Sequence, residues 1–193
     1  MLEDDEPLMQ ALQAYHKVDT KLRLRLREVC QERTYPGQYH LLRPGQVANQ
    51  AWFLLTGSAQ MYHVHGQKGE EETLWIWKQG EIVWAIRSFC RRLPCLYYLQ
   101  LLEECRLLSV HYRDLEELAI TFPDYRRLER NLTEAYHARV LHHFHERTSL
   151  PARERYVRLM QRTPQLFQKV PAKIIASFLG MSPATLSRLR SAK

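Results

Sequence analysis

The clearest signal in this chain is the stretch Ile175-Ala176-Ser177-Phe178-Leu179-Gly180-Met181-Ser182-Pro183-Ala184-Thr185-Leu186-Ser187-Arg188-Leu189-Arg190. It predicts two short helices joined by a sharp turn at Gly180, because glycine adopts the left-handed conformation without steric cost. Ser182 can cap the second helix, and Pro183 suits its first position. Ala176 is small enough to lie where the two helices cross. The stretch therefore predicts a helix-turn-helix.

The two faces of this motif differ in chemistry. Apolar residues should form the core that the two helices share: Ile175, Leu179, Leu186 and Leu189. The opposite face is polar and basic, and Arg188 there can donate two hydrogen bonds to guanine in the major groove. The candidate DNA-binding residues, for base edges or phosphates, are Lys173, Ser182, Ala184, Thr185, Ser187, Arg188, Arg190 and Lys193. An ordinary helical hairpin with a basic surface is the alternative.

The distribution of charge favours the DNA interpretation. The 193 residues hold 28 Lys and Arg and 21 Asp and Glu, a formal net charge of +7. Residues 1–121 hold 14 basic and 16 acidic residues, a net charge of −2, and residues 122–193 hold 14 and 5, a net charge of +9. A basic segment attracts polyanions, because contacts to phosphates release condensed counterions. A basic surface that faces only solvent would have the same composition. The charge alone therefore does not distinguish it from a DNA-binding surface, and the helix-turn-helix motif is the stronger evidence.

A run without glycine or proline precedes the motif, from Asp124 to about Thr148. It predicts one helix of roughly 37 Å at 1.5 Å per residue. Leu128, Leu132 and Ala135 recur at intervals of four and three residues and are followed by Val140, Leu141 and Phe144, which indicates an apolar seam for dimerisation with a second copy of the chain. A single amphipathic core helix is the alternative.

The first part of the chain has a different pattern. Gly45, Gly57, Gly69 and Gly80 separate short apolar runs, and turn signals at such intervals are typical of an all-β sandwich or barrel. The expected strands are Trp52–Leu55, Gln60–Val64, Thr73–Trp77, Leu96–Leu102 and Leu107–Tyr112, with a hairpin tip at Gly66–Gly69. The first thirty residues are helix-like, with Leu8, Leu12 and Tyr15 on one face. We expect a sensor domain at 1–121, a connecting helix at 122–148 and a DNA-binding domain at 149–193.

In combination, these features resemble the Crp/Fnr superfamily, the cyclic-nucleotide-sensor type of bacterial transcription factor. The stretch Ile175–Arg190 is close to the form usual in Bacteroidetes members, and Arg153–Met160 followed by Pro164 resembles the helix that leads into it. The resemblance covers about residues 28–193 and is strongest after Pro151. It implies an α+β fold with an N-terminal double-stranded β-helix (a jelly roll of the cyclic-nucleotide-binding kind), a long dimerisation helix and a C-terminal helix-turn-helix.

The resemblance also implies partners. They are double-stranded DNA, a second copy of the chain and, as further candidates, RNA polymerase and an unknown small-molecule effector. A two-fold homodimer would read a palindromic promoter site with half-sites about one helical turn apart. Family members often add a β-hairpin wing after the recognition helix. The sequence ends three residues after Arg190, so we expect a helix-turn-helix without a clear wing.

The effector site departs from the family pattern. In members that bind cyclic AMP, the resemblance implies a Gly-Glu pair in a short helical cassette and a later Arg followed by Ser or Thr, which bond the ribose and the cyclic phosphate. Trp84-Ala85 and Leu96-Tyr97 stand at these places. We therefore expect no binding of cyclic AMP. The candidate pocket residues are Trp84, Arg87, Tyr97 and Tyr98, where the aromatic rings either fill the pocket or line one for an apolar or aromatic ligand.

A rival signal is His63-Val64-His65 followed by Glu70, which partly matches the first metal motif of cupin enzymes. Two histidines at alternate strand positions share a face, as metal ligands must. Trp77 stands where that motif needs a glycine, and no second motif follows. We therefore prefer a solvent-facing hairpin end over a cupin-like metalloenzyme, and expect no enzymatic activity, no metal and no cofactor.

The cysteines and the hydropathy of the sequence indicate the cellular compartment in which we expect the protein. Cys30, Cys90, Cys95 and Cys105 form no CxxC pair, so we expect free thiols rather than a disulfide framework or cluster ligands. The acidic start Met1–Glu6 is unlike a secretory signal, and no run reaches the roughly 18 apolar residues of a membrane span. These observations favour a cytoplasmic protein with no membrane partner. A scaffold that keeps the fold without DNA recognition is a third hypothesis.

Overall fold

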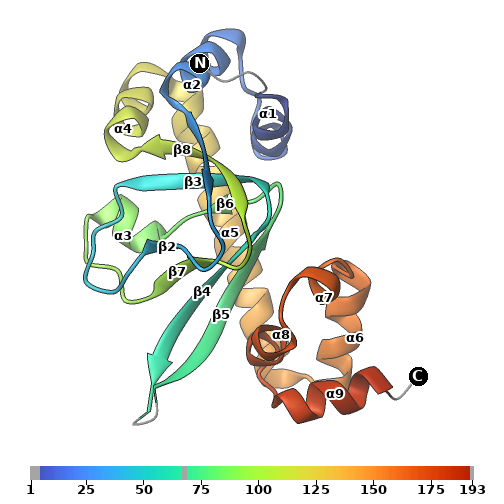
Figure 1. Ribbon diagram of the computed structural model, residues 1–193. Coiled ribbons are helices and arrows are strands. Elements are labelled where there is room, and N and C mark those ends of the chain that lie inside the picture. Colours follow the sequence, from blue (N-terminus) through green and yellow to red (C-terminus); the bar gives the residue numbers. More distant parts are fainter. Residues whose placement is uncertain (1–4, 67–68, 192–193) are drawn as a thin grey trace.

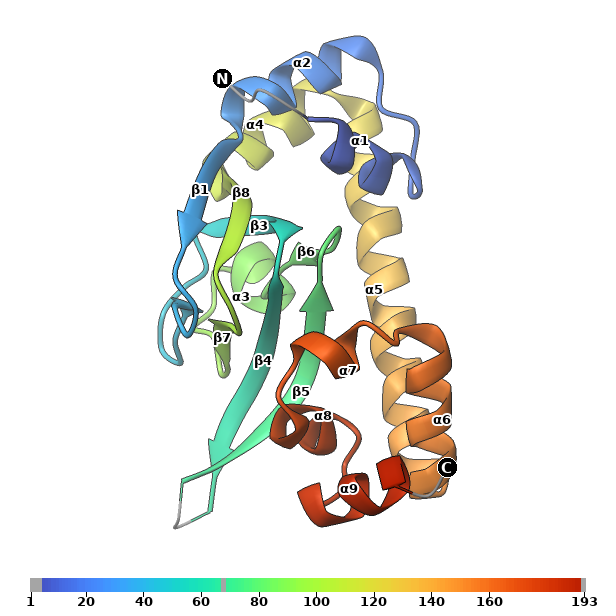
Figure 2. The same cartoon turned by 45° about the vertical axis from the view of Figure 1, so that its right-hand side comes forward.

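The computed structural model describes residues 5–66 and 69–191. Figures 1 and 2 show a β-roll with helices at its N-terminal end, one long helix along its side, and the C-terminal helices folded back against the far half of that long helix. This arrangement confirms the predicted α+β class, with the roll first, the long helix next and the short helices last.

The roll consists of two four-stranded antiparallel sheets within the described residues. Their strand orders are β1-β8-β3-β6 and β2-β7-β4-β5. The strands are β1 (Gln31–Tyr35), β2 (His40–Leu42), β3 (Gln50–Thr56), β4 (Ser58–His65), β5 (Glu70–Lys78), β6 (Ile82–Val83), β7 (Tyr98–Leu101) and β8 (Cys105–His111). All five strands expected from the sequence are present, although β8 ends at His111 and Tyr112 begins a helix.

The β4–β5 hairpin is the longest strand pair of the roll. Its register runs from Ser58 opposite Lys78 to His65 opposite Glu70. Gly66 and Gly69 have φ of +69° and +67°, as the expected turn requires, while residues 67 and 68 lie outside the described residues. At the other end, Gly57 has φ of +91°, and a Cβ there would collide with Sγ of Cys105. Only glycine fits this turn without displacing β8.

The helix-like N-terminal segment contains, from residue 5 onward, the two helices α1 (Glu6–Gln13) and α2 (Thr20–Val29). The second begins where the Asp19 carboxylate accepts a hydrogen bond of 2.7 Å from the backbone N–H of Leu22. Both helices cover the outer face of the β1-β8-β3-β6 sheet together with α4 (Tyr112–Thr121) and the start of α5 (Pro123–Ser149). The short helix α3 (Ile86–Arg91) lies between β6 and β7.

Four further helices follow α5: α6 (Ala152–Arg162), α7 (Leu166–Lys169), α8 (Ala172–Phe178) and α9 (Pro183–Ser191). Their apolar side chains join the core of the roll in one continuous cluster that includes Trp75, Leu159 and Ile175. The helix-turn-helix is therefore packed against the roll.

Two sequence-based expectations concern the whole chain. The four cysteines are free thiols, three of them buried and Cys90 exposed. Among the described residues, no helix combines the length and the hydropathy needed to cross a membrane.

Candidate nucleic-acid interface and sensor cavity

The helix-turn-helix forms where the sequence predicts it. Gly180 has φ of +64°, and a Cβ at this position would come within 2.7 Å of Nε of Arg147. Ser182 caps α9, since its hydroxyl accepts a hydrogen bond of 3.1 Å from the backbone N–H of Thr185. Ile175 and Leu186 are fully buried between the helices, and Ala176 lies at their crossing. The turn and the cap are as expected, and so are three of the four core residues, since Ile175, Leu179 and Leu186 are buried whereas Leu189 is half-buried.

The surface of α9 presents three of the predicted side chains, Ala184, Ser187 and Arg188, which are exposed on one face of the helix. Ser182 at its start and Lys173 on α8 are exposed as well. Thr185 is half-buried, and its hydroxyl lies 2.9 Å from that of Ser182. Within the described part of the chain, Arg188 forms no ion pair, so its guanidinium is available to an anion.

The structure corrects the outward placement of Arg190. Its guanidinium lies 5.4 Å from the ring centroid of Phe167 on α7, and its Nη2 is buried. Arg190 follows Leu186 by four positions and so shares the inner side of α9 with it. Lys193, the last predicted contact, lies outside the described residues.

A cavity of about 510 Å³ lies between the roll, α3 and α5. Three of the four predicted pocket residues line it: Trp84, Arg87 and Tyr97. The long helix closes one side with Thr133, Tyr136 and His137. The size suits a small-molecule ligand, and the Trp84 indole offers a buried N–H that has no hydrogen-bond partner in the described part of the chain.

Tyr98 does not belong to this cavity, and the structure corrects that assignment. Its ring stacks on that of Tyr62, with centroids 4.9 Å apart, and meets the ring of His40 at 5.5 Å. The neighbouring residue Tyr97 points to the cavity, because successive side chains of an extended segment alternate between faces. The sequence alone did not show which of these two adjacent tyrosines lines the cavity.

Comparisons with known proteins agree with this geometry. Residues 32–121 match the family model described as the cyclic nucleotide-binding domain. The fold is similar to that of FixK2 from Bradyrhizobium japonicum, at a TM-score of 0.72 and 16% identity over 84% of this chain and 83% of that one. This chain has a Crp/Fnr-type fold.

Two other solved structures extend this Crp/Fnr-type match. The global regulator CLP of Xanthomonas campestris, described as c-di-GMP responsive, gives a TM-score of 0.66 and 21% identity over 90% of both chains. The catabolite activator protein of Thermus thermophilus gives 0.57 and 20% over 94% of this chain and 85% of that one. The descriptions of these two proteins name a regulator and an activator. No curated protein matches the chain significantly.

In this Crp/Fnr-type fold, the helix-turn-helix docks on the β4–β5 hairpin. The backbone N–H of Thr73 on β5 donates a hydrogen bond of 2.8 Å to the hydroxyl of Ser177 on α8. Phe178 packs edge-on against Trp75 and stacks on His143 of α5, with ring centroids 6.1 and 4.0 Å apart. Burial and the nearby charge of Arg147 lower the pKa of His143 to about 4, so this imidazole is neutral at neutral pH.

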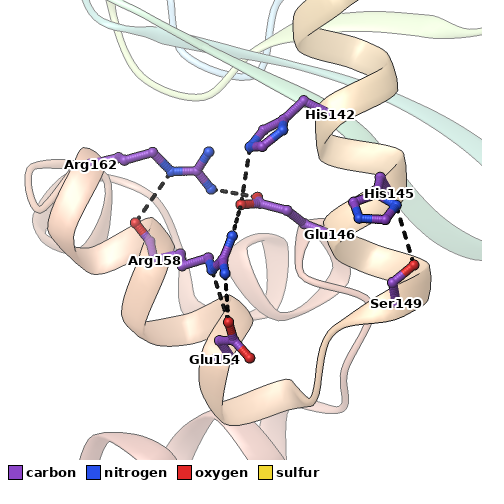
Figure 3. Close-up of polar contacts among 7 residues, drawn as sticks. All are labelled: His142, His145, Glu146, Ser149, Glu154, Arg158 and Arg162. Atoms are coloured by element: carbon purple, nitrogen blue, oxygen red, sulfur yellow. Dashed lines mark hydrogen bonds and ion pairs between the residues drawn. The ribbon is translucent and has the colours of Figure 1, made fainter.

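The elbow between α5 and α6 is held by Glu146, whose side chain is buried. Figure 3 shows three basic side chains around its carboxylate: Arg162 at 2.5 Å, His142 at 3.2 Å and Arg158 at 3.4 Å. Burial alone would raise the pKa of Glu146, but the hydrogen bond and charge of Arg162, with help from its neighbours, lower it below the ordinary value. Glu146 is therefore ionised at neutral pH and pairs with the positive charges of Arg158 and Arg162.

The apolar residues expected to form the seam of the long helix do not all face the same surroundings. Leu128 is only 2% exposed and packs against the N-terminal helices, so it is not available to a second copy. Leu132 and Ala135 are half-buried. The exposed apolar side chains are Leu141 and Phe144, at 67% and 63%. The three-and-four spacing marks an apolar stripe correctly but does not say whether it faces the core or a partner.

The histidine pair also gains an unexpected neighbour. The carboxylate that lies near both His63 and His65 is that of Glu72, which pairs with His63 in the hairpin register, whereas Glu70, opposite His65, is not part of this cluster. Sequence reasoning missed Glu72, Glu146, His143 and Phe178 as contacts. The hairpin register fixes the position of Glu72. Glu146 precedes Arg147 in the sequence, but the sequence does not show that its side chain is buried. No local pattern indicates the stack of His143 on Phe178.

Proposed function

We propose that this chain is a transcriptional regulator that binds double-stranded DNA as a homodimer at a palindromic site. The observation that carries the proposal is the exposed face of α9, with Ala184, Ser187 and Arg188 at the end of a capped helix-turn-helix. Such a helix fits the major groove, where arginine reads guanine and small side chains permit close approach. The positive charge of residues 122–193 supports binding to phosphates.

The homodimer is supported by the long helix. Leu141 and Phe144 lie one turn apart on α5 and expose most of their side chains, which in a helix pair would be buried in the seam. We place the dimer contact at these residues, with Leu132 and Ala135 as candidates toward the N-terminal side. A two-fold axis along α5 would present two copies of α9 to successive major grooves.

The sensor cavity is proposed to bind no cyclic AMP. Trp84 and Ala85 are buried apolar residues at one edge of the cavity, and Leu96 and Tyr97 lie at another. None of the four carries the charge that a ribose and a cyclic phosphate need. The rings of Trp84, Tyr97 and Tyr136 suit an aromatic small molecule, although Arg87 and Arg91 also line the cavity.

Selection of bound sequences from random DNA by the purified full-length protein tests the proposal. We expect a palindromic consensus whose two halves are centred about one helical turn apart. Failure to enrich any sequence at low salt would favour the scaffold hypothesis. An enriched site without two-fold symmetry would contradict the homodimer.

The same experiment has a ligand arm. Millimolar cyclic AMP should leave both the affinity for the selected site and the melting temperature unchanged. A ligand that binds the folded state at about 100 times its Kd stabilises it by about 2.7 kcal/mol, which shifts the melting temperature by several degrees. Such a shift with cyclic AMP would contradict the proposed pocket chemistry.

A further inference from the structure

Three potential metal ligands converge on the β4–β5 hairpin. Nε2 of His63 lies 3.3 Å from Oε2 of Glu72, and Nε2 of His65 lies 3.8 Å from the same oxygen. The three donor atoms all lie within 4.8 Å of one another. The strand geometry produces this cluster. His63 and His65 are two positions apart on β4, so their side chains share one face of the strand, and Glu72 on β5 is paired with His63.

The spacing and the donor types fit a zinc ion. Zinc binds histidine nitrogen and carboxylate oxygen at about 2.0–2.2 Å, so tetrahedral ligand atoms lie roughly 3.4 Å apart. The distances from Oε2 of Glu72 to Nε2 of His63 and of His65, 3.3 and 3.8 Å, are close to that value. Two imidazoles and one carboxylate are a borderline set that prefers zinc to the hard cations magnesium and calcium.

The two carboxylate oxygens of Glu72 have different partners, as is common for a carboxylate that binds a metal. Its Oε1 accepts a hydrogen bond from Arg147 on α5, while its Oε2 is directed to the two histidines. A hydrogen bond to one oxygen fixes the orientation of a ligating carboxylate. Nδ1 of His63 is buried and has no hydrogen-bond partner among the described residues, so the position of its ring is set by packing.

The cluster is open to solvent on one side. The exposed fractions of the side chains are 31% for His63, 46% for His65 and 29% for Glu72. An ion can therefore enter, and a water molecule can take the fourth position. We propose that His63, His65 and Glu72 form a zinc site with three protein ligands.

The site has a defined place in the molecule. Glu72 links the hairpin to α5 through Arg147, and Thr73, the next residue, bonds Ser177 of the helix-turn-helix. Zinc bound here fixes the end of the hairpin beside the contact that holds α8. The site is separate from the sensor cavity, since none of its three ligands lines that cavity. It also does not depend on the proposed DNA contacts.

Calorimetric titration of the metal-free full-length protein with zinc chloride tests the proposal. We expect one zinc ion per chain and a higher melting temperature of the zinc-loaded protein. His65→Ala leaves the bond between Glu72 and Arg147 in place and should weaken binding at least about tenfold. His63→Ala should do the same, and Glu72→Gln provides a third variant.

Glu70→Gln is the matched control. It removes a carboxylate from the same strand but not from the cluster, so it should bind zinc like the parent protein. It also separates this site from the cupin-like ligand set, in which Glu70 would be essential. Circular dichroism verifies that each variant is folded.

Absence of saturable zinc binding by the parent protein would overturn the proposal. So would binding that is unchanged in both His63→Ala and His65→Ala, since zinc would then lie on other histidines or on the cysteines. Loss of binding in Glu70→Gln with retention in Glu72→Gln would also overturn it.

Discussion

Arg188 and Arg190 stand two positions apart on α9, and the helix turns their side chains to different sides. Arg188 is exposed, whereas Arg190 covers the ring of Phe167. Arg188→Ala should relax the DNA consensus at one base pair per half-site, at a cost of about 1–3 kcal/mol, because a bidentate contact to guanine is lost. Binding measurements on the selected site and on single-base variants check this.

Arg190→Ala is the control for Arg188→Ala, since it removes the same charge from the same helix. It should keep the consensus and instead lower the free energy of unfolding by about 0.5–1 kcal/mol, through loss of the cation–π contact with Phe167. If Arg190→Ala relaxed the consensus and Arg188→Ala did not, the assignment of the two faces would be reversed.

The residues that sequence alone placed correctly are those with a strong local requirement. Gly180 needs a positive φ, and Ser182 caps a helix, so both can be read without the fold. Arg190 was placed wrongly because a charged side chain was assumed to be exposed to solvent. Its spacing of four from Leu186 places it on the inner side, where a long arginine side chain can cover an aromatic ring.

At the scale of the element, the elbow between α5 and α6 depends on Glu146. Glu146→Gln removes a buried carboxylate that interacts with Arg158, Arg162 and His142, and it should lower the free energy of unfolding by about 2 kcal/mol. Chemical denaturation measures this change. Glu154→Gln is the control, because Glu154 pairs with Arg158 at the surface and should contribute below about 1 kcal/mol. Equal losses in the two variants would contradict the central role of Glu146.

Elements differed in how well the sequence predicted them. Strands β3, β4 and β5 were all predicted, because each contains apolar residues, either consecutive or alternating with polar ones, and is bounded by glycines. The strand β1 was not, because it lies at a sheet edge and reads Gln-Glu-Arg-Thr-Tyr, with four of its five residues exposed. The long helix was found, but the sequence did not separate its two apolar parts, since Leu128 faces the core whereas Leu141 and Phe144 are exposed.

At the scale of the whole molecule, the basic C-terminal region is packed against the roll rather than tethered to it. The contact joins β5 to α8, more than a hundred residues apart in the chain, through Thr73 and Ser177 and through Trp75 and Phe178. No local pattern predicts such a contact. The hairpin and α5 are therefore in direct contact with the helix-turn-helix.

The stack of His143 on Phe178 makes this docking sensitive to acid. Burial and the charge of Arg147 lower the pKa of His143 to about 4 in the folded protein, whereas histidine in an unfolded chain titrates near about 6.5. The unfolded state therefore binds more protons between these values, and stability falls as the pH is lowered through this window. Between about pH 7.5 and about pH 5, the loss attributable to His143 is about 2 kcal/mol.

Equilibrium unfolding at the two pH values, for the parent protein and for His143→Phe, measures this contribution. The phenylalanine ring keeps an aromatic partner for Phe178 and cannot take up a proton, so the variant should lose about 2 kcal/mol less than the parent on acidification. Glu146 does not confound the comparison, because its pKa is lowered and its stabilisation is lost only at lower pH. An equal loss in both proteins would show that other groups cause the acid sensitivity, and that the docked helix-turn-helix does not hold His143 in its neutral form.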